Sequence, residues 1–555
     1  MYKCPHCGGE LDFLPGTEII KCEYCGSEFS PSELIEEKEV TAAEYQEKTV
    51  EEPEDKQDAR TIEATIFTCP QCGGEIYSLD QSAVTFCSYC GSQVTLQSRL
   101  SRIRKPDVVI PFKLTAAQGM QEYYRKVKRS LFVPSEMKKD SEVEKLRGIY
   151  MPYWVYNVKA PEMLKVSSSV EHQSGQYVMK DHYSTTFTAE GSIDGIAYDA
   201  AAAFSDELSG AIAPYDFREA KDFTPGYFSS FYADEGDVEA YLYEDEAISV
   251  AGDAYAENVY HPDMKKYGLD KQKIAKEFIT DGVERKLGYY PVWFLANKNK
   301  KGNRVSYATI NGQTGKAAVD LPVDFTKYLI ASLIIAVPIF VLLTLFLTMT
   351  PRVLGFVVMA LSIIAVIFAN LKLNEVYTRK GMFDDLGLSS KDPNAQKKVM
   401  AEIAKRRKES SKVKSVPSMG SVIGSTFFMA IFILGVIYFV TSSPGIAILG
   451  FLVILAARIV WNLVQRRKPR PNKKIIVAAP MKEKIGTLWK CLAAFVVVGA
   501  VAIIFPVNDI YFYIADIIAI LLTGWTVLDI VRSHNLLTMR KLPQFGKRGG
   551  DEHEY

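Results

Sequence analysis

Eight of the nine cysteines in this 555-residue chain lie within its first 90 residues, in four Cys-x-x-Cys pairs. The pairs form two sets, and fourteen residues separate the two pairs of each set. Four thiolates on two tight turns can complete the tetrahedral shell of a zinc ion. A glycine follows the second cysteine of every pair, and it allows the positive φ that turns backbone N–H groups toward sulfur. The sequence therefore predicts two structural Zn²⁺ sites, with the ligands Cys4, Cys7, Cys22 and Cys25 in the first and Cys69, Cys72, Cys87 and Cys90 in the second.

The two sets repeat one unit. Cys4-Pro-His-Cys-Gly-Gly-Glu is matched by Cys69-Pro-Gln-Cys-Gly-Gly-Glu, and Cys22-Glu-Tyr-Cys-Gly-Ser by Cys87-Ser-Tyr-Cys-Gly-Ser. Redox-active dithiols are the alternative, but a repeated four-cysteine spacing is poor evidence for thioredoxin-like chemistry. Cysteines used in this way suit a reducing compartment better than a secreted disulfide framework. We therefore expect both units to lie in the cytoplasm.

The charge of the two units argues against nucleic acid as a partner. Residues 1–31 contain two lysines beside five acidic residues, and residues 68–97 contain no lysine or arginine. Phosphate binding depends on cationic contacts. A structural or protein-docking role is therefore favoured for the ribbons.

Residues 107–320 are predicted to form an α+β domain with an internal repeat. Tyr150-Met-Pro-Tyr-Trp154 recurs as Tyr289-Tyr-Pro-Val-Trp293, each time after a charged helical stretch and before a strand. Both tryptophans are expected to anchor the core. The Asn311-Gly312 turn predicts a hairpin, and the aromatic-rich run from Phe217 to Tyr232 is expected to pack between layers.

Motifs of catalysis are missing from the α+β domain. The α+β domain contains no H-E-x-x-H, no G-x-S-x-G and no phosphate-binding loop. His172 and His182 could face the same side of a sheet, but no carboxylate pairs with them convincingly. We therefore expect the chain not to be an enzyme.

Six largely apolar runs follow the α+β domain, in three pairs with short turns. Each run can cross a bilayer core of about 30 Å at roughly 1.5 Å per residue, so the sequence predicts an all-α six-helix transmembrane region. The connecting segments are basic, with 12 Lys+Arg against 6 acidic residues in 372–420 and 9 against 1 in 465–490. The positive-inside rule places these segments and both termini in the cytoplasm. We also expect Arg458 and Asp529 to pair.

Charge divides the chain into two halves. Residues 1–320 carry 36 Lys+Arg against 51 Asp+Glu, and residues 321–555 carry 29 against 14, so a net charge of −15 is followed by +15. A basic membrane half predicts contact with anionic lipid on the cytoplasmic side.

These patterns predict a multidomain, multi-pass cell-membrane protein with two small β zinc ribbons, an α+β cytoplasmic domain and six transmembrane helices. The expected boundaries are 1–32 for zinc ribbon 1, 33–64 for an acidic linker, 65–98 for zinc ribbon 2, 107–320 for the α+β domain, 328–371 for transmembrane hairpin 1, 372–420 for a basic loop, 422–464 for hairpin 2, 465–490 for a second basic loop, 491–531 for hairpin 3 and 532–555 for a cytoplasmic tail.

Further motifs accompany the cysteine knuckles, namely Ile110-Pro-Phe-Lys113, Gly148-Ile-Tyr-Met-Pro-Tyr-Trp154, Ala213-Pro-Tyr-Asp216 and Asn311-Gly-Gln-Thr-Gly-Lys316. As a set these motifs resemble a family of bacterial multi-pass membrane proteins with a zinc ribbon of the transcription-factor-IIB type. Some relatives look like membrane partners of flotillin-like (SPFH) proteins and phage-shock-protein-A homologues. The resemblance implies a recruiting role in envelope stress, and it brings no established catalytic residues.

We therefore expect a non-enzymatic, membrane-anchored docking platform whose zinc ribbons and α+β domain recruit cytoplasmic protein partners to the inner membrane surface. A transporter or channel subunit regulated by the cytoplasmic domain is the alternative. A membrane-tethered nucleic-acid-binding regulator is a second alternative.

Overall fold

A small antiparallel sheet at the N-terminus holds the first four cysteines. It has the order β1-β2-β3, with β1 at Leu11–Leu14, β2 at Ile19–Cys22 and β3 at Glu28–Phe29. The computed structural model describes residues 4–33, 61–70, 75–78, 87, 97–138, 146–174, 177–201, 206–234, 236, 238–298, 304–346, 350–380, 481–504 and 507–541.

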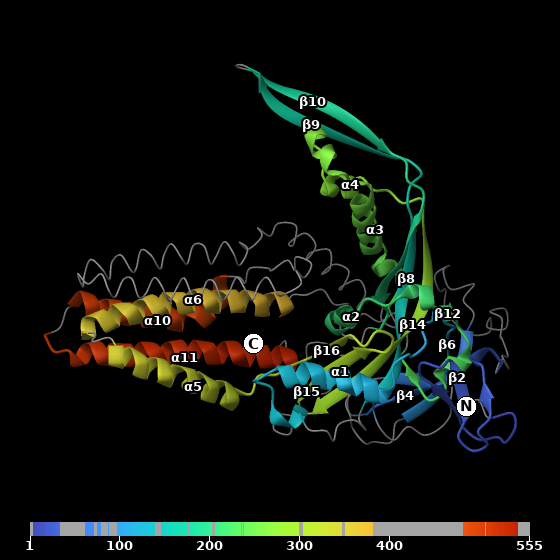
Figure 1. Ribbon diagram of the computed structural model, residues 1–555, viewed down its shortest axis with the longest axis horizontal. Helices are drawn as coiled ribbons and strands as arrows, with labels where there is room; N and C mark the ends of the chain where they lie inside the picture. Colours follow the sequence, from blue (N-terminus) through green and yellow to red (C-terminus); the bar gives the residue numbers. More distant parts are fainter. Residues whose placement is uncertain are drawn as a thin grey trace.

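A twelve-stranded sheet forms the body of the described chain (Figure 1). Its hydrogen-bonded order is β12-β7-β14-β8-β13-β5-β4-β6, with β11 on β8 and with β15 joining β14 to β16 and β17. The strands are β4 (Thr61–Thr68), β5 (Glu75–Ser78), β6 (Gln97–Arg104), β7 (Val108–Val109), β8 (Arg147–Lys159), β11 (Ser192–Asp199), β12 (Lys221–Asp222), β13 (Tyr232–Ala233), β14 (Gly282–Lys298), β15 (Arg304–Asn311), β16 (Ala317–Val319) and β17 (Arg540–Lys541). The strands of the second cysteine unit belong to this sheet, because β5 pairs with β13 and β13 pairs with β8.

The two copies of the internal repeat form the centre of the sheet. β8 and β14 pair antiparallel, so that Pro152 lies opposite Tyr289 and Tyr150 lies opposite Pro291. Helix α1 (Ala116–Arg129) precedes β8, and helices α3 (Glu244–Val259) and α4 (Lys271–Lys276) precede β14. Each repeated motif thus lies inside its strand, not before a strand as predicted, and the two strands pair with each other.

Both tryptophans of the repeat are core residues, as predicted. The indole N–H of Trp154 donates to the carbonyl of Val238 at 2.7 Å, and that of Trp293 donates to the carbonyl of Leu114 at 2.9 Å. Both side chains are buried. A buried indole requires an acceptor for its N–H, and the backbone supplies one in each copy.

The central strand β8 is buried on both faces. Tyr150 and Tyr156 lie in one buried hydrophobic cluster, whereas Ile149, Met151 and Tyr153 lie in a second. Successive side chains of a strand point to opposite faces of the sheet, so elements must cover the sheet on both sides. This explains why the sequence of β8 reads as a continuous apolar and aromatic run.

A long hairpin extends away from the main sheet (Figure 1). It consists of β9 (Leu164–Ser174) and β10 (Tyr177–Phe187), which pair with each other as a separate two-stranded sheet. The 3₁₀ helix η9 (Pro262–Tyr267) supports one face of it, because Ser168 Oγ donates to the carbonyl of Tyr267 at 2.8 Å.

The predicted six-helix transmembrane region is wrong. The C-terminal helices of the described chain are α5 (Phe325–Phe346), α6 (Pro351–Lys380), α10 (Met481–Ile504) and α11 (Ile510–Thr538). Within the described residues, one stretch, Ile510–Leu536 in α11, is long and apolar enough to span a membrane. The apolar stretches Phe325–Ile339 and Gly486–Val501 have fewer than 18 residues and, at about 1.5 Å per residue, do not reach across roughly 30 Å. The expected second hairpin, 422–464, lies outside the described residues.

The end of α11 is attached to the sheet. The side-chain amide of Asn535 forms two hydrogen bonds with the backbone of Val323, accepting from its N–H at 2.7 Å and donating to its carbonyl at 2.9 Å. Beyond the helix, β17 pairs antiparallel with β15. The last described helix is thus fixed to the edge of the sheet domain.

Candidate metal centre

Two matching turns carry the first four cysteines. In the first turn the amide of Gly8 donates to the carbonyl of Cys4 at 2.8 Å, and in the second the amide of Gly26 donates to the carbonyl of Cys22 at 2.9 Å. The two glycines have φ values of +72° and +73°, in the left-handed region that favours glycine. The positive φ predicted for both positions is confirmed.

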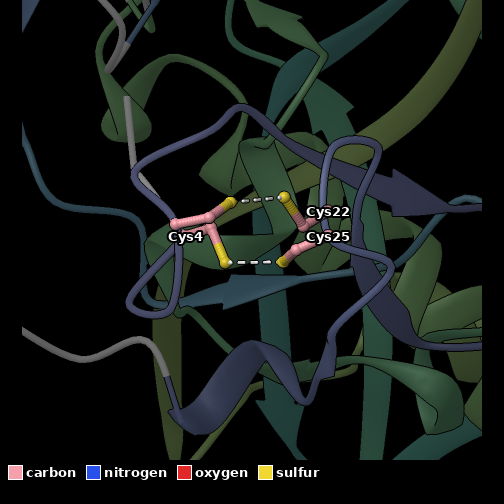
Figure 2. Close-up of side chains that lie close together, drawn as sticks. Cys4, Cys22 and Cys25 are labelled. Carbon is pink, nitrogen blue, oxygen red and sulfur yellow. Dashed lines mark hydrogen bonds between the residues drawn. The ribbon is translucent and has the colours of Figure 1, made fainter.

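The four thiols of these turns lie together. Cys4 Sγ is 3.5 Å from Cys25 Sγ, Cys7 Sγ is 3.5 Å from Cys22 Sγ, and all four sulfur atoms lie within 4.8 Å of one another. Figure 2 shows the sulfur atoms of Cys4, Cys22 and Cys25 turned toward one another. A tetrahedral ion with metal–sulfur bonds of about 2.3 Å needs sulfur–sulfur distances of roughly 3.8 Å. The four cysteines could therefore bind one metal ion.

The protonation of these thiols is set by their neighbours. The hydroxyl of Ser27, 3.1 Å from Cys25 Sγ, and the backbone amide of Ser27 lower the pKa of the Cys25 thiol to about 6. The backbone amide of Gly9 acts to lower the pKa of Cys7, but hydrogen bonds to the thiols of Cys22 and Cys25 outweigh it and raise that pKa. Cys25 is thus a thiolate at neutral pH without the help of a metal.

The centre is half open. Cys4 and Cys22 are buried, whereas Cys7 and Cys25 are exposed. Beside them Tyr24 is 78% exposed. One side of the site thus faces the protein and the other faces the surroundings.

The buried side of the ribbon packs on the aromatic-rich run of the sheet domain. The ring of Phe13 lies 5.7 Å from that of Tyr227 and 6.3 Å from that of Phe231. Gly226 is required there, because a Cβ on it would lie 2.9 Å from both Ile20 and the carbonyl of Pro31. The run was expected to pack between layers, and one of those layers is the ribbon.

The second cysteine set is placed in part. Cys69 and Cys87 are both buried, in the hydrophobic cluster that also contains Ile110 and Tyr153. Cys72 and Cys90 lie outside the described residues. A second metal site therefore stays a prediction.

The two histidines of the hairpin do not face the same side. His172 lies opposite Met179 and His182 lies opposite Ser169, and this register puts the two imidazoles on opposite faces. His172 Nδ1 lies 3.5 Å from a carboxylate oxygen of Asp181, and both side chains are about half exposed. The sequence missed this pair because its partners are on different strands.

A protein of Bacillus subtilis (strain 168), named uncharacterized protein YdjG, is similar to this chain. The two are 25% identical over 334 residues, which is 59% of this chain and 91% of the relative. No family model matches the chain, and no solved structure matches it.

Proposed function

We propose that this protein is a non-enzymatic, membrane-anchored docking platform that binds cytoplasmic protein partners at the inner membrane surface. The observation that carries the proposal is the β9–β10 hairpin. It extends from the sheet domain and pairs with no other strand in the described chain.

Strand β10 begins, at the end of this hairpin, with exposed apolar residues. Tyr177 is 78% exposed, Val178 is 72% exposed and Met179 is 50% exposed. Exposed aromatic and Met side chains in contiguous groups are typical of protein-binding surfaces. On the partner strand Gln173 and His172 lie opposite Val178 and Met179. The ion pair Lys180–Glu171 comes next along the strands, so polar side chains border the apolar ones. The hairpin therefore has the composition of a small docking surface.

Anchoring rests on α11. Only 22% of its most apolar window is buried inside the protein, and Ile517, Leu521 and Trp525 are exposed on it. Exposed apolar side chains along a helix of this length suit lipid contact. The bonds of Asn535 and β17 to the sheet domain would then hold the hairpin near the membrane surface. The basic composition of the C-terminal half supports anionic lipid on that side.

The metal has a structural role in this proposal. An all-thiolate donor set favours zinc among the common divalent ions, and the first ribbon is fixed to the sheet domain by aromatic packing. We propose a second zinc ion at Cys69, Cys72, Cys87 and Cys90. The purified chain should then contain two zinc ions, and Cys69→Ser should leave one. A zinc content of one in both proteins would contradict the second site.

Partners of the flotillin-like or phage-shock type are part of the proposal, on the strength of the motif resemblance alone. The test is co-purification of protein partners with the full chain in mild detergent. It compares the wild type with the double variant Tyr177→Ser/Val178→Ser. The matched control is Tyr24→Ser, because Tyr24 is as exposed as Tyr177 but lies on the ribbon. We expect a stoichiometric protein partner with the wild type and with the control, and its loss with the hairpin variant at unchanged zinc content. Equal recovery of partners by all three proteins would overturn the hairpin as the docking element.

A transporter or channel subunit is the second candidate. The observation that favours it is a buried carboxyl group, that of Asp516, within the candidate span of α11. Ionisable groups inside a span commonly mark ion or proton pathways. Substrate-dependent flux through liposomes that contain only the purified chain would place this candidate first.

A further inference from the structure

Asp516 is a buried acidic residue of α11. Its side chain is 5% exposed, and among the described residues neither of its carboxylate oxygens has a donor within hydrogen-bonding distance. An ionised carboxylate in apolar surroundings is very costly unless it is paired. The position is therefore unsuited to a permanent charge.

Three helices meet at this carboxyl group. A Cβ built on Gly355 of α6 would lie 4.0 Å from Asp516 Oδ1, 3.6 Å from Phe512 of α11 and 3.7 Å from Val498 of α10. The neighbouring buried cluster consists of small and aliphatic residues, namely Ala494, Val498, Ala515 and Ala519 with Val358, Val497, Val501 and Leu522 against them. The described residues of this neighbouring cluster are thus all apolar.

The ion pairs among the described residues of these helices lie elsewhere. Asp529 of α11 pairs with Lys490 of α10 and with Arg532, and Lys372 of α6 pairs with Glu375. Asp529 is thirteen residues from Asp516 on α11, which is about 20 Å along the axis. On α6 the nearest ionisable residue along the sequence is Arg352, three residues before Gly355. Arg352 therefore has to be included in any test.

We infer that Asp516 is a proton-binding site at the junction of α6, α10 and α11. Its carboxyl group is neutral in the resting protein, and it ionises by transferring its proton to a water molecule that reaches the junction. This inference goes beyond the docking role and does not depend on the hairpin. It rests on the burial of the group and on the absence of a hydrogen-bond donor among the described residues, so partner binding and proton binding can fail separately.

The test is reaction with dicyclohexylcarbodiimide, an apolar reagent that adds to protonated carboxyl groups in apolar surroundings. The full chain in native membranes is treated at several pH values, and modified peptides are identified by mass. We expect the adduct on Asp516 and none on Asp509, which lies exposed just before α11. The labelling rate at Asp516 should fall as the pH rises. No adduct on Asp516 at any pH, or equal labelling of Asp509, would overturn the inference.

The variant Arg352→Gln tests whether Asp516 is neutral or is ionised and paired with Arg352. Labelling of Asp516 in both the wild type and Arg352→Gln supports a carboxyl group that is neutral without help. Labelling in Arg352→Gln alone would show that Arg352 keeps Asp516 ionised, and would overturn the inference.

An infrared measurement gives a second readout without a reagent. The wild-type protein should show a protonated-carboxyl carbonyl band that Asp516→Asn removes and that Asp509→Asn keeps. A carbonyl band that Asp516→Asn leaves unchanged would contradict the proton-binding site, whatever the result of the labelling experiment.

Discussion

Ser27 lowers the pKa of one exposed thiol of the first ribbon, that of Cys25. Its hydroxyl and its amide both bond to Cys25 and lower the pKa of that thiol to about 6. In the metal-free protein, alkylation of Cys25 should therefore be half-maximal near pH 6 and reach a plateau above it, because a lowered pKa leaves the thiolate present at neutral pH. Alkylation rates of the exposed Cys25 and Cys7 by mass spectrometry would check this. Cys7, whose pKa is raised, should react more slowly at neutral pH.

Ser27→Ala is the control for this prediction. Without the hydroxyl donor, the half-maximal pH for Cys25 should move up toward the ordinary thiol value of about 8.5. An unchanged profile would show that Ser27 does not set the ionisation of Cys25.

Asn311 is the second residue with a measurable role. Its side-chain oxygen accepts from the amides of Gln313 and Thr314, and its side-chain nitrogen donates to the carbonyls of Ile212 and Pro214. Asn311→Ala should destabilise the protein by about 2–4 kcal/mol, because buried partners lose their bonds. The drop in thermal midpoint of the detergent-solubilised chain measures this. Thr314→Ala, at an exposed position of the same turn, should leave the midpoint nearly unchanged.

These residues show what a local pattern can predict. Type and spacing were sufficient for Cys4, Cys7, Cys22 and Cys25, because a short turn determines the ligand geometry. The Asn311-Gly312 turn also joins β15 to β16, as predicted. The bonds from Asn311 to carbonyls 97 and 99 residues away were beyond prediction, because no local pattern encodes the partner of a long-range contact.

At the scale of elements, the ribbon depends on the sheet domain. Phe13 is buried against Tyr227 and Phe231, so Phe13→Ala should cost about 3–5 kcal/mol and release the ribbon from its support. Hydrogen exchange of residues 4–33 should then rise while the metal content stays unchanged. The same measurement on Tyr24→Ala should match the wild type, since Tyr24 is exposed. Unchanged exchange in Phe13→Ala would contradict the packing role.

The start of helix α1 has a local signal in the sequence, whereas the number of membrane spans was predicted wrongly. Helix α1 begins where the capping box of Thr115 and Gln118 satisfies the first backbone amides, and such signals are local. The number of membrane spans was overestimated, because apolar composition alone does not determine the length of each apolar helical stretch. Asp529 pairs with Lys490, and Arg458, its predicted partner, lies outside the described residues.

At the scale of the molecule, β17 limits how the chain can lie in a membrane. β15 precedes the C-terminal helices, β17 follows them, and the two strands are hydrogen-bonded to each other. Two strands of one sheet must lie on the same side of a bilayer. The number of crossings between Asn311 and Arg540 must then be even, including zero.

Asn508 is exposed at the end of α11 that lies away from β17. If Ile510–Leu536 crosses the bilayer, Asn508→Cys should react with a membrane-impermeant maleimide in intact cells. Tyr24→Cys, on the ribbon, should react only after lysis. Reaction of both variants only after lysis would mean that α11 does not cross.

A positive result would have a consequence for the rest of the chain. An even count that includes α11 requires a second crossing between residues 320 and 510. The β15–β17 pairing would then join the chain segments before and after the membrane-spanning part. Movement of α11 along its axis would therefore be transmitted directly to the edge of the sheet.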